Sequence, residues 1–516
     1  MTRKLPPFHP LLVPLLPPLI LYSRNFDSVV PGDAVAPALT CLAATLLGWS
    51  ALKGARFDGR AAALIASAAV VLGFGFAPLA RWVGRAGPGL GASQRGWLAL
   101  VLEGSALVGL AVLLKARPGL ARWLTRPADA AALGLVGVSA FGLASRSVGD
   151  PSARPPIARI APLPALSRPE RPPDVYFIVL DAYGRSDILK ELYGFDNGPF
   201  LERLERKGFR VARRSTSNYV QTALSIAATL NFRYLDDLEG SPSSKRAPLR
   251  TLIAEGAAVR AFRSQGYRIV SFASGFGATE LPGVADEYLA PPIHLGDFSM
   301  LLANQTPLGL LGGRFRPHAM HRERILSAFD RLPGVAEGEV PTFCFVHIVG
   351  PHPPFVFGEH GEDVSAREGA YSLSDGEGWR AVEGHGGVDG YVARYRAQVA
   401  FLTGRVEEAV DRLLARSTRR PIIVIQGDHG PGGHFESMKA EPNDLRERTG
   451  ILNAWLLPDA EGPMPDDAIS PVNTFRVILD RTFQAGLGCL PDRTFYSSYK
   501  APYRFIDVTD QVRPDH

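Results

Sequence analysis

The chain has 516 residues, 46% of them hydrophobic and 21% charged, so it is longer than one ordinary domain. Its net charge of +5 does not indicate a nucleic-acid partner, because many of the Arg and Lys residues lie in short loops between apolar runs. The three cysteines are too far apart in sequence to predict a disulfide framework or a Cys-x-x-Cys metal site.

Apolar stretches precede residue 150 at about 8–22, 35–52, 61–80, 97–114 and 128–144. The second to fourth approach the length of about 20 residues that crosses a bilayer core. The first is short and contains three prolines, and a cleaved signal peptide is the alternative there, although an Ala-x-Ala-like cleavage site is missing. We predict a transmembrane helical region of about five helices over residues 1–146.

Basic residues predict the orientation of these helices. Positive charges gather near the N-terminus and in the loops around 53–60 and 115–126, which lie on one side if all five stretches cross. The positive-inside rule makes that side cytoplasmic, although the opposing loops also carry some arginines. We therefore expect a multi-pass protein of a bacterial-type inner membrane, with everything after Ala144 extracytoplasmic.

Residues 147–173 are rich in Pro and Arg and predict a semi-extended linker. Beyond them, apolar runs typical of strands alternate with helical patterns over residues 174–516, as in Val175–Leu180 and in the long helical pattern that leads into Ile422. Alternation of this kind predicts an α/β domain with a mainly parallel sheet covered by helices on both faces. The Gly-rich, acidic stretch 358–390 predicts a surface excursion or lid.

A metal site is predicted where two strand-like runs end. Asp181 follows one run, and Asp428 and His429 follow the run that starts at Ile422. Ligands gather at the carboxyl ends of the strands in such a sheet, and carboxylate with imidazole suits a divalent cation such as zinc or manganese. For Asp181 taken alone, a helix cap or a turn is an equally good interpretation.

The nucleophile candidates are the hydroxyls of Ser217, Thr222 and Ser225, in a stretch that predicts a buried helix. A helix start favours an anion, and a metal-bound hydroxyl can act as an alkoxide. We choose Thr222, although chemistry alone does not separate the three.

Three histidines near strand ends remain: His347, His352 and His434. They could form a second metal site or bind a substrate phosphate. His347 is the weaker candidate because it still lies within a strand pattern.

Taken together, these residues resemble the alkaline phosphatase superfamily, in its sulfatase-like, membrane-anchored branch, which includes lipoteichoic acid synthases and lipid A phosphoethanolamine transferases. The resemblance covers nearly all of 174–516 and implies an alkaline phosphatase-like domain. It implies that Asp181, Thr222, Asp428 and His429 hold the catalytic metal, with Thr222 as nucleophile. The TALS stretch is similar to T-A-V-S around the threonine of the transferases, and PHPPF is similar to a substrate-side histidine loop, which implicates His352.

The chain also departs from these relatives. The sulfatase signature that yields formylglycine ends in Arg, whereas here Thr222 is followed four residues later by Ile226. Sulfate ester hydrolysis by that route is therefore disfavoured. The transferases carry a Glu at the first acidic position and several disulfides, so Asp181 and the few cysteines argue against that particular substrate.

The sequence thus predicts a metal-dependent phosphotransferase of the cell envelope that works through a covalent phospho-threonine on Thr222. We expect a lipid- or glycan-linked phosphoryl substrate, the membrane as a partner and no nucleic acid. The alternatives are a phosphodiesterase or sulfatase-like hydrolase of the same fold, and a non-catalytic envelope protein that only binds a ligand.

Overall fold

The computed structural model describes residues 6–26, 29–149, 159–160, 162–311, 316–369, 371–439, 444–458 and 465–512. The chain divides into two compact units. We call Met1–Arg154 with Leu295–Pro317 the helical unit, and Pro155–His294 with His318–His516 the sheet unit. Much of the predicted linker 147–173, namely 150–158 and 161, lies outside the described residues, and the preceding helix continues to Gly149.

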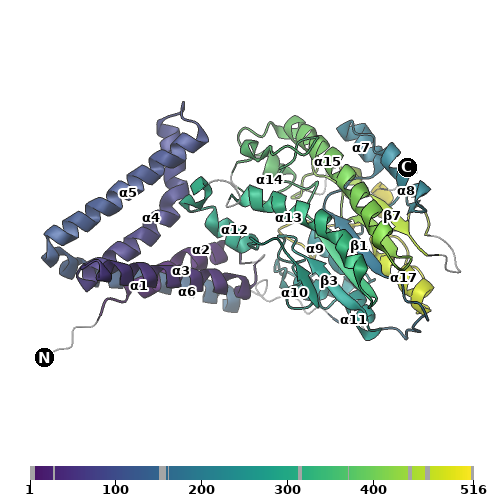
Figure 1. Cartoon of the computed structure of the whole chain (residues 1–516), viewed down its shortest axis with the longest axis horizontal. Coiled ribbons are helices and arrows are strands. Elements are labelled where there is room, and N and C mark those ends of the chain that lie inside the picture. The colour runs from purple at the N-terminus through teal and green to yellow at the C-terminus, as the bar shows by residue number, and fades with distance from the viewer. Residues whose placement is uncertain are drawn as a thin grey trace. The chain divides into compact units, whose positions relative to one another are not determined.

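Among the described residues, four helices of the helical unit are long and apolar enough to cross a membrane: α3 (Pro31–Gly54), α4 (Gly59–Ala86), α5 (Ala92–Ala116) and α6 (Pro118–Gly149) (Figure 1). Large apolar side chains on them are exposed, including Phe141 at 75% and Val138 at 73%. Exposed apolar surface on long helices is what lipid contact requires, since the hydrophobic effect no longer drives these side chains inward.

The first apolar stretch, predicted as one of about five helices, is helical but interrupted. It forms three short consecutive segments: α1 (His9–Leu12), η1 (Val13–Leu15) and α2 (Leu16–Arg24). Pro14, Pro17 and Pro18 explain the interruption, because proline lacks the N–H that helix bonding needs and crowds the preceding turn. The start of the stretch is fixed by Asp129 of α6, whose Oδ1 accepts from the backbone N–H groups of Phe8 and His9 at 3.0 and 2.8 Å.

The helical unit also receives a segment from far along the chain. Leu295–Pro317 contains α12 (Asp297–Ala303) and η4 (Pro307–Leu311), and it groups with the N-terminal helices. In the core of this unit, Phe298 and Leu302 of α12 pack with Leu21 of α2. The predicted range 174–516 therefore contains a segment that the structure groups with the helical unit.

A seven-stranded sheet organises the described part of the sheet unit, in the order β2-β7-β6-β1-β5-β3-β4. β1 pairs in parallel with β5 and β6, and β3 pairs in parallel with β5 and β4, whereas β7 runs antiparallel to β6 and β2. The prediction of a mainly parallel sheet is confirmed. The strands are β1 (Val175–Leu180), β2 (Arg210–Val211), β3 (Arg268–Phe272), β4 (Glu287–Leu289), β5 (Thr342–Ile348), β6 (Ile422–Gly427) and β7 (Asn453–Leu456).

Helices cover both faces of this sheet, as predicted (Figure 1). Alternate residues of β1 enter two different cores: Val175, Phe177 and Val179 join one, and the residues between them join the other. The first core includes side chains from α9 (Thr222–Leu230), α10 (Ala247–Ala254), α11 (Ala257–Ser264) and α17 (Thr474–Phe483). The second includes side chains from α7 (Ser186–Tyr193), α8 (Gly198–Arg206), α13 (Pro317–Arg331) and α15 (Gly387–Arg416).

The remaining elements of the sheet unit are short and mostly lie in the connections. They are η3 (Asp236–Leu238), η6 (Leu332–Glu337), η7 (Ser365–Arg367), α14 (Glu377–Arg380), α16 (Leu445–Thr449), η8 (Pro471–Asn473), α18 (Thr509–Val512) and the two-stranded sheet of β8 (Phe495–Tyr496) and β9 (Ile506–Asp507).

The stretch 358–390, predicted as a surface excursion or lid, contains buried aromatic side chains, although most of 381–390 is exposed or half-buried. Tyr371 and Trp379 are buried, and the Trp379 indole N–H donates to Glu368 at 3.0 Å. These aromatic side chains supply the apolar area that the composition of the stretch otherwise lacks. The stretch is therefore a surface segment that these side chains anchor to the sheet unit.

Strand register explains how distant residues meet. Leu180 at the end of β1 pairs with Ile348 of β5 and with Gly427 of β6, and Val179 pairs with His347. The residues that follow these strands therefore leave the sheet at the same edge, which is formed by the carboxyl ends of β1, β5 and β6.

Candidate functional site

Asp181, Asp428 and His347 form a buried cluster at this edge. One ligand atom from each lies within 4.8 Å of the others. Asp181 follows β1 and Asp428 follows β6, as the sequence predicted, whereas His347 stands one residue before the end of β5. The Asp181 Oδ2 atom is 3.3 Å from His347 Nε2.

Ligand atoms of the cluster lack the hydrogen bonds that buried polar atoms normally make. Asp181 Oδ1, Asp428 Oδ2 and His347 Nε2 have no hydrogen-bond partner among the described residues. Such atoms are rare, because an unpaired buried polar group costs about 1–3 kcal/mol. A cation among them would supply the missing partner. Two carboxylates with imidazole are a donor set that fits zinc or manganese.

His429 adjoins the cluster and its tautomer follows from its neighbours. Its Nδ1 is 2.9 Å from the Gly430 carbonyl oxygen and must donate, so Nε2 carries the lone pair. Nε2 lies 3.6 Å from Asp181 Oδ1 and 3.3 Å from Asp428 Oδ2. Burial and, next, the nearby Arg448 lower the pKa of His429, which favours this neutral form, the form that binds metals.

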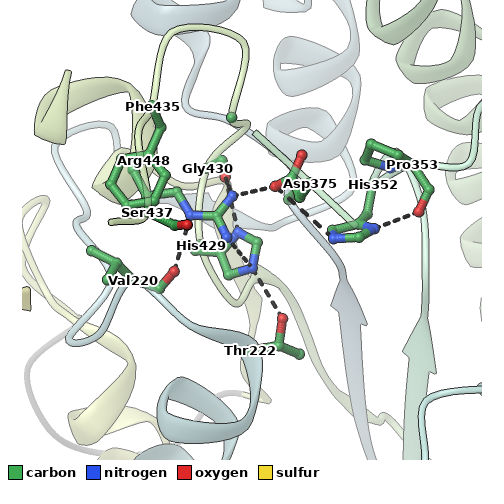
Figure 2. A network of polar contacts seen from close by, with 12 residues as sticks. Val220, Thr222, His352, Pro353, Asp375, His429, Gly430, Phe435, Ser437 and Arg448 are labelled. Carbon is green, nitrogen blue, oxygen red and sulfur yellow. Dashed lines mark hydrogen bonds and ion pairs between the residues drawn. The ribbon is translucent and has the colours of Figure 1, made fainter. Parts of the chain in front are cut away.

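Thr222 is the first residue of α9, and its Oγ1 is 3.0 Å from His429 Nε2 (Figure 2). The hydroxyl thus lies where a helix N-terminus favours negative charge, beside an imidazole nitrogen of the cluster. The structure therefore brings together all four residues expected at the metal, Asp181, Thr222, Asp428 and His429.

Neither of the other candidate hydroxyls makes a hydrogen bond to His429 among the described residues. Ser217 Oγ donates to the Tyr219 carbonyl at 2.6 Å. Ser225 Oγ is buried within α9, one turn beyond Thr222, and has no hydrogen-bond partner among the described residues. Thr222 is the candidate hydroxyl that contacts His429.

Two of the three predicted histidines lie at the cluster. His347 is one of its members, and its Nδ1 is 2.8 Å from Thr279 Oγ1, which fixes the ring. His352 Nδ1 is bonded to the Pro353 carbonyl at 2.5 Å, and its Nε2 lies 3.9 Å from Asp375. Burial alone would lower the pKa of His352, but the charges of Asp181 and Asp375 raise it.

His434 is held differently. Its Nδ1 lies 3.0 Å from Glu447 Oε1 and its backbone N–H donates to Glu447 Oε2 at 2.9 Å. Its side chain is 37% exposed, whereas the side chains of His347 and His429 are fully buried. The contacts of His434 therefore tie it to Glu447 rather than to the metal cluster.

The backbone at the cluster adopts an uncommon conformation. Ala182, directly after Asp181, has φ of +63°, and its N–H donates to Asp428 Oδ1 at 3.1 Å. A non-glycine residue in this region is strained by about 1–2 kcal/mol and persists only where its surroundings hold it. In this conformation the Ala182 N–H holds the Asp428 carboxylate beside Asp181 by a hydrogen bond.

Sequence reasoning missed two residues of the site, Asp375 and Arg448. Arg448 lies in the short helix α16, with its Nη2 3.1 Å from His429 Nε2. Its Nη1 donates to Asp375 Oδ2 at 2.5 Å (Figure 2). The two side chains are 1% and 3% exposed. Burial alone would raise the pKa of Asp375, but Arg448 holds it well below its usual range.

Three negative groups, Asp181, Asp428 and Asp375, thus converge near one nucleophile candidate. Burial alone would raise the pKa of Asp181, but His352, His347 and His429 hold it below its usual range. The arrangement can bind a divalent cation and place a hydroxyl beside it, which is the chemistry of transfer at an anionic ester centre.

Comparisons with known proteins give matches of fold alone. No family model matches the chain, and no curated protein matches it. Among solved structures, the phosphoethanolamine transferase EptA from Neisseria meningitidis is similar at 13% identity and TM-score 0.41, over 92% of this chain and 79% of that one.

Two further matches each cover roughly two thirds of the chain. The periplasmic domain of EptC from Escherichia coli, in complex with zinc, matches at 12% identity and TM-score 0.44, over 67% of this chain and 96% of that one. A 2-O GAG sulfatase matches at 16% identity and TM-score 0.40, over 62% of this chain and 72% of that one. These are the kinds of protein that the sequence resemblance named. With identities this low, we take the function from the geometry of the site itself.

Proposed function

We propose that the chain is a metal-dependent phosphotransferase of the cell envelope in which Thr222 is the nucleophile. One observation carries this proposal: the Thr222 hydroxyl, at a helix N-terminus, lies 3.0 Å from His429 Nε2 beside a cluster of buried, unpaired ligand atoms. A structural role for Thr222 would not require two orphaned carboxylate oxygens and an orphaned imidazole nitrogen nearby.

Asp181, Asp428, His429 and Thr222 would hold a divalent cation, zinc or manganese, and His347 is placed to serve as a further ligand. When bound, such a cation lowers the pKa of a coordinated hydroxyl and stabilises charge on phosphoryl oxygens. The strained backbone at Ala182 and the Gly430 carbonyl hold Asp428 and His429 in place before substrate arrives.

In the first step, Thr222 releases its hydroxyl proton to solvent and its Oγ1 attacks phosphorus. The Oγ1–P bond forms as the P–O bond to the leaving group breaks, and the leaving oxygen takes a proton from His352 Nε2. In the second step, an acceptor hydroxyl gives its proton to His352 Nε2 as its oxygen bonds to the same phosphorus, and the Thr222–P bond breaks as Oγ1 takes a proton back from solvent.

The position of the domain favours a lipid-linked substrate. The basic loops 53–60 and 115–126 both lie at one end of the long helices, and the positive-inside rule favours the cytoplasm for that end, which supports an extracytoplasmic sheet unit. This conclusion holds whether or not the short first stretch crosses, because α3 to α6 are even in number and start and finish on the same side.

The test replaces Thr222 with Ala in the full chain, purified in detergent and supplied with vesicles of phosphatidylethanolamine and phosphatidylglycerol. We expect turnover to be abolished while bound zinc or manganese, measured by plasma mass spectrometry, is retained. Unchanged turnover in Thr222→Ala would overturn the nucleophile. Absence of any bound divalent ion in the wild-type protein at neutral pH would instead favour a non-catalytic protein.

A further inference from the structure

We propose that Arg448 binds a non-bridging oxygen of the phosphoryl group beside Thr222, and that Asp375 is the positioning residue that holds the guanidinium there. This inference rests on the proposed function, because it concerns the same phosphoryl group. It adds a binding group and a positioning residue that come from two segments outside the strand ends, α16 and the stretch 358–390.

The guanidinium of Arg448 is immobilised on three sides. Nε donates to the Val220 carbonyl at 3.0 Å, and Nη1 donates to Asp375 and to the Gly430 carbonyl at 3.1 Å. Nη2 is 3.1 Å from His429 Nε2. Of the five N–H donors of an arginine, these contacts use four, and Nη2 contacts the same His429 nitrogen as the Thr222 hydroxyl (Figure 2).

The His429 lone pair cannot serve both Arg448 and a cation. Nε2 is the nitrogen through which His429 would ligate a metal, because Nδ1 is committed to the Gly430 carbonyl. With Nε2 so used, the Nη2 donors lose their acceptor at a position that is 1% exposed. A buried guanidinium without an acceptor is costly, and a phosphoryl oxygen on Thr222 would satisfy it.

The charge balance of the site also calls for a fixed cation. Asp181, Asp428 and Asp375 are three carboxylates around the place that an anionic phosphoryl group must enter. Arginine stays charged at every physiological pH and offers planar, paired donors to phosphate oxygens. Arg448 therefore offsets a repulsion that grows when the substrate binds.

Asp375 holds the Arg448 guanidinium through Nη1, whereas Nη2 contacts His429. Its Oδ1 accepts from Tyr391 Oη at 2.6 Å and its Oδ2 accepts from Arg448. The chain makes room for this carboxylate at Gly432, where an added Cβ would stand 2.9 Å from Asp375 Oδ2. The stretch 358–390 thus contributes one carboxylate, that of Asp375, to the site.

A purely structural ion pair between Arg448 and Asp375 predicts something different. Such a pair would stabilise the fold. Replacing its guanidinium would not change the affinity of the metal-loaded protein for free phosphate. The two roles can therefore be separated by measuring phosphate binding and zinc content together.

The experiment uses the full chain in detergent, loaded with zinc, and measures binding of inorganic phosphate by calorimetry. We expect Arg448→Lys, which keeps the charge but loses the planar fork, to weaken phosphate binding by about tenfold or more. Asp375→Asn should weaken it by about threefold, with zinc content equal to wild type in both variants. Arg446→Lys is the matched control, because Arg446 lies on the same helix but pairs with exposed Glu191, and its phosphate affinity should stay within about twofold.

Phosphate affinity of Arg448→Lys within about twofold of wild type would overturn the proposal, and so would loss of zinc from that variant. A structure of the wild-type protein with zinc and orthovanadate needs no variant: Arg448 Nη2 should lie within about 3 Å of a vanadate oxygen. An Arg448 that contacts no vanadate oxygen would refute the assignment. If instead wild-type protein never forms an adduct on Thr222 yet binds phosphate through Arg448, the proposed function fails and this inference stands.

Discussion

Gly430 lies so close to neighbouring backbone that it leaves no room for a side chain. A Cβ added at Gly430 would stand 2.1 Å from the Glu447 carbonyl oxygen and 2.8 Å from the Gly450 carbonyl oxygen. Both neighbours are backbone atoms, so neither can rotate away. The Gly430 N–H also donates to the Arg448 carbonyl at 2.7 Å, so the loop after His429 rests directly on α16.

Replacing Gly430 with Ala must therefore separate this loop from α16 by about 1 Å. Overpacking of this kind typically costs about 1–3 kcal/mol, and the upper end applies because backbone must move. The same shift disturbs the Gly430 carbonyl that orients His429, and loss of such a supporting contact typically weakens metal binding about 10–100-fold. We expect both effects in Gly430→Ala.

Gly404 provides the matched control. It lies in the middle of α15, and an added Cβ there would meet nothing within 4 Å. Gly404→Ala should therefore stabilise the protein by up to about 1 kcal/mol, because alanine is the better helix former. The assay is thermal unfolding of the full chain in detergent, with zinc affinity measured by competition with a chelating dye. The reasoning is refuted if Gly430→Ala unfolds at the wild-type temperature and binds zinc as tightly as wild type.

Three further predictions concern pH, the core and the metal. The hydrogen bond that the His434 ring donates to Glu447 and, less strongly, the charge of Glu447 raise the pKa of His434. This contact therefore stabilises the fold fully below the ordinary pKa of 6.5 and is lost as pH rises through the raised value. The difference in unfolding temperature between wild type and His434→Gln should accordingly shrink above about pH 6.5, and a constant difference would contradict this assignment. Phe475 is fully buried against Phe177, Phe262 and Phe343, so Phe475→Ala should cost about 3–5 kcal/mol in urea unfolding, and a loss below about 1 kcal/mol would show that the core is described wrongly. Removal of divalent ions with a chelator should lower the unfolding temperature and added zinc should restore it, whereas an identical melting curve with and without the chelator would argue against a metal among the unpaired ligand atoms.

Residues that directly follow strands could be predicted from the sequence. Asp181 and the pair Asp428–His429 follow apolar runs, and parallel strands bring their carboxyl ends to one edge. His347 was ranked low because it stands within a strand pattern. Its role depends on the register Val179↔His347, which no local pattern reveals.

Arg448 and Asp375 could not be predicted because their burial is a tertiary property. Arg448 sits in a five-residue helix with no apolar periodicity to mark a buried face. Asp375 lies in a Gly-rich, acidic stretch that resembles solvated sequence. The sequence of this stretch does contain one indication of packing, its large aromatic residues. Tyr371 and Trp379 are buried, and large aromatic side chains in otherwise polar sequence indicate packing.

The first apolar stretch shows where composition misleads. Its hydrophobicity predicts one short helix, whereas the prolines divide it into α1, η1 and α2. The basic loops 53–60 and 115–126 lie on the same side of the four long helices whether or not this first stretch crosses the membrane.

The central claim is a covalent bond between phosphorus and Thr222, and mass spectrometry tests it most directly. The full chain with zinc is incubated with vesicles of phosphatidylethanolamine and phosphatidylglycerol, quenched in acid and digested. We predict a phosphoryl-containing adduct on the peptide that carries Thr222, absent from the Thr222→Ala protein. Turnover of the phospholipid with no adduct on Thr222, or with the adduct on another residue, would contradict the account.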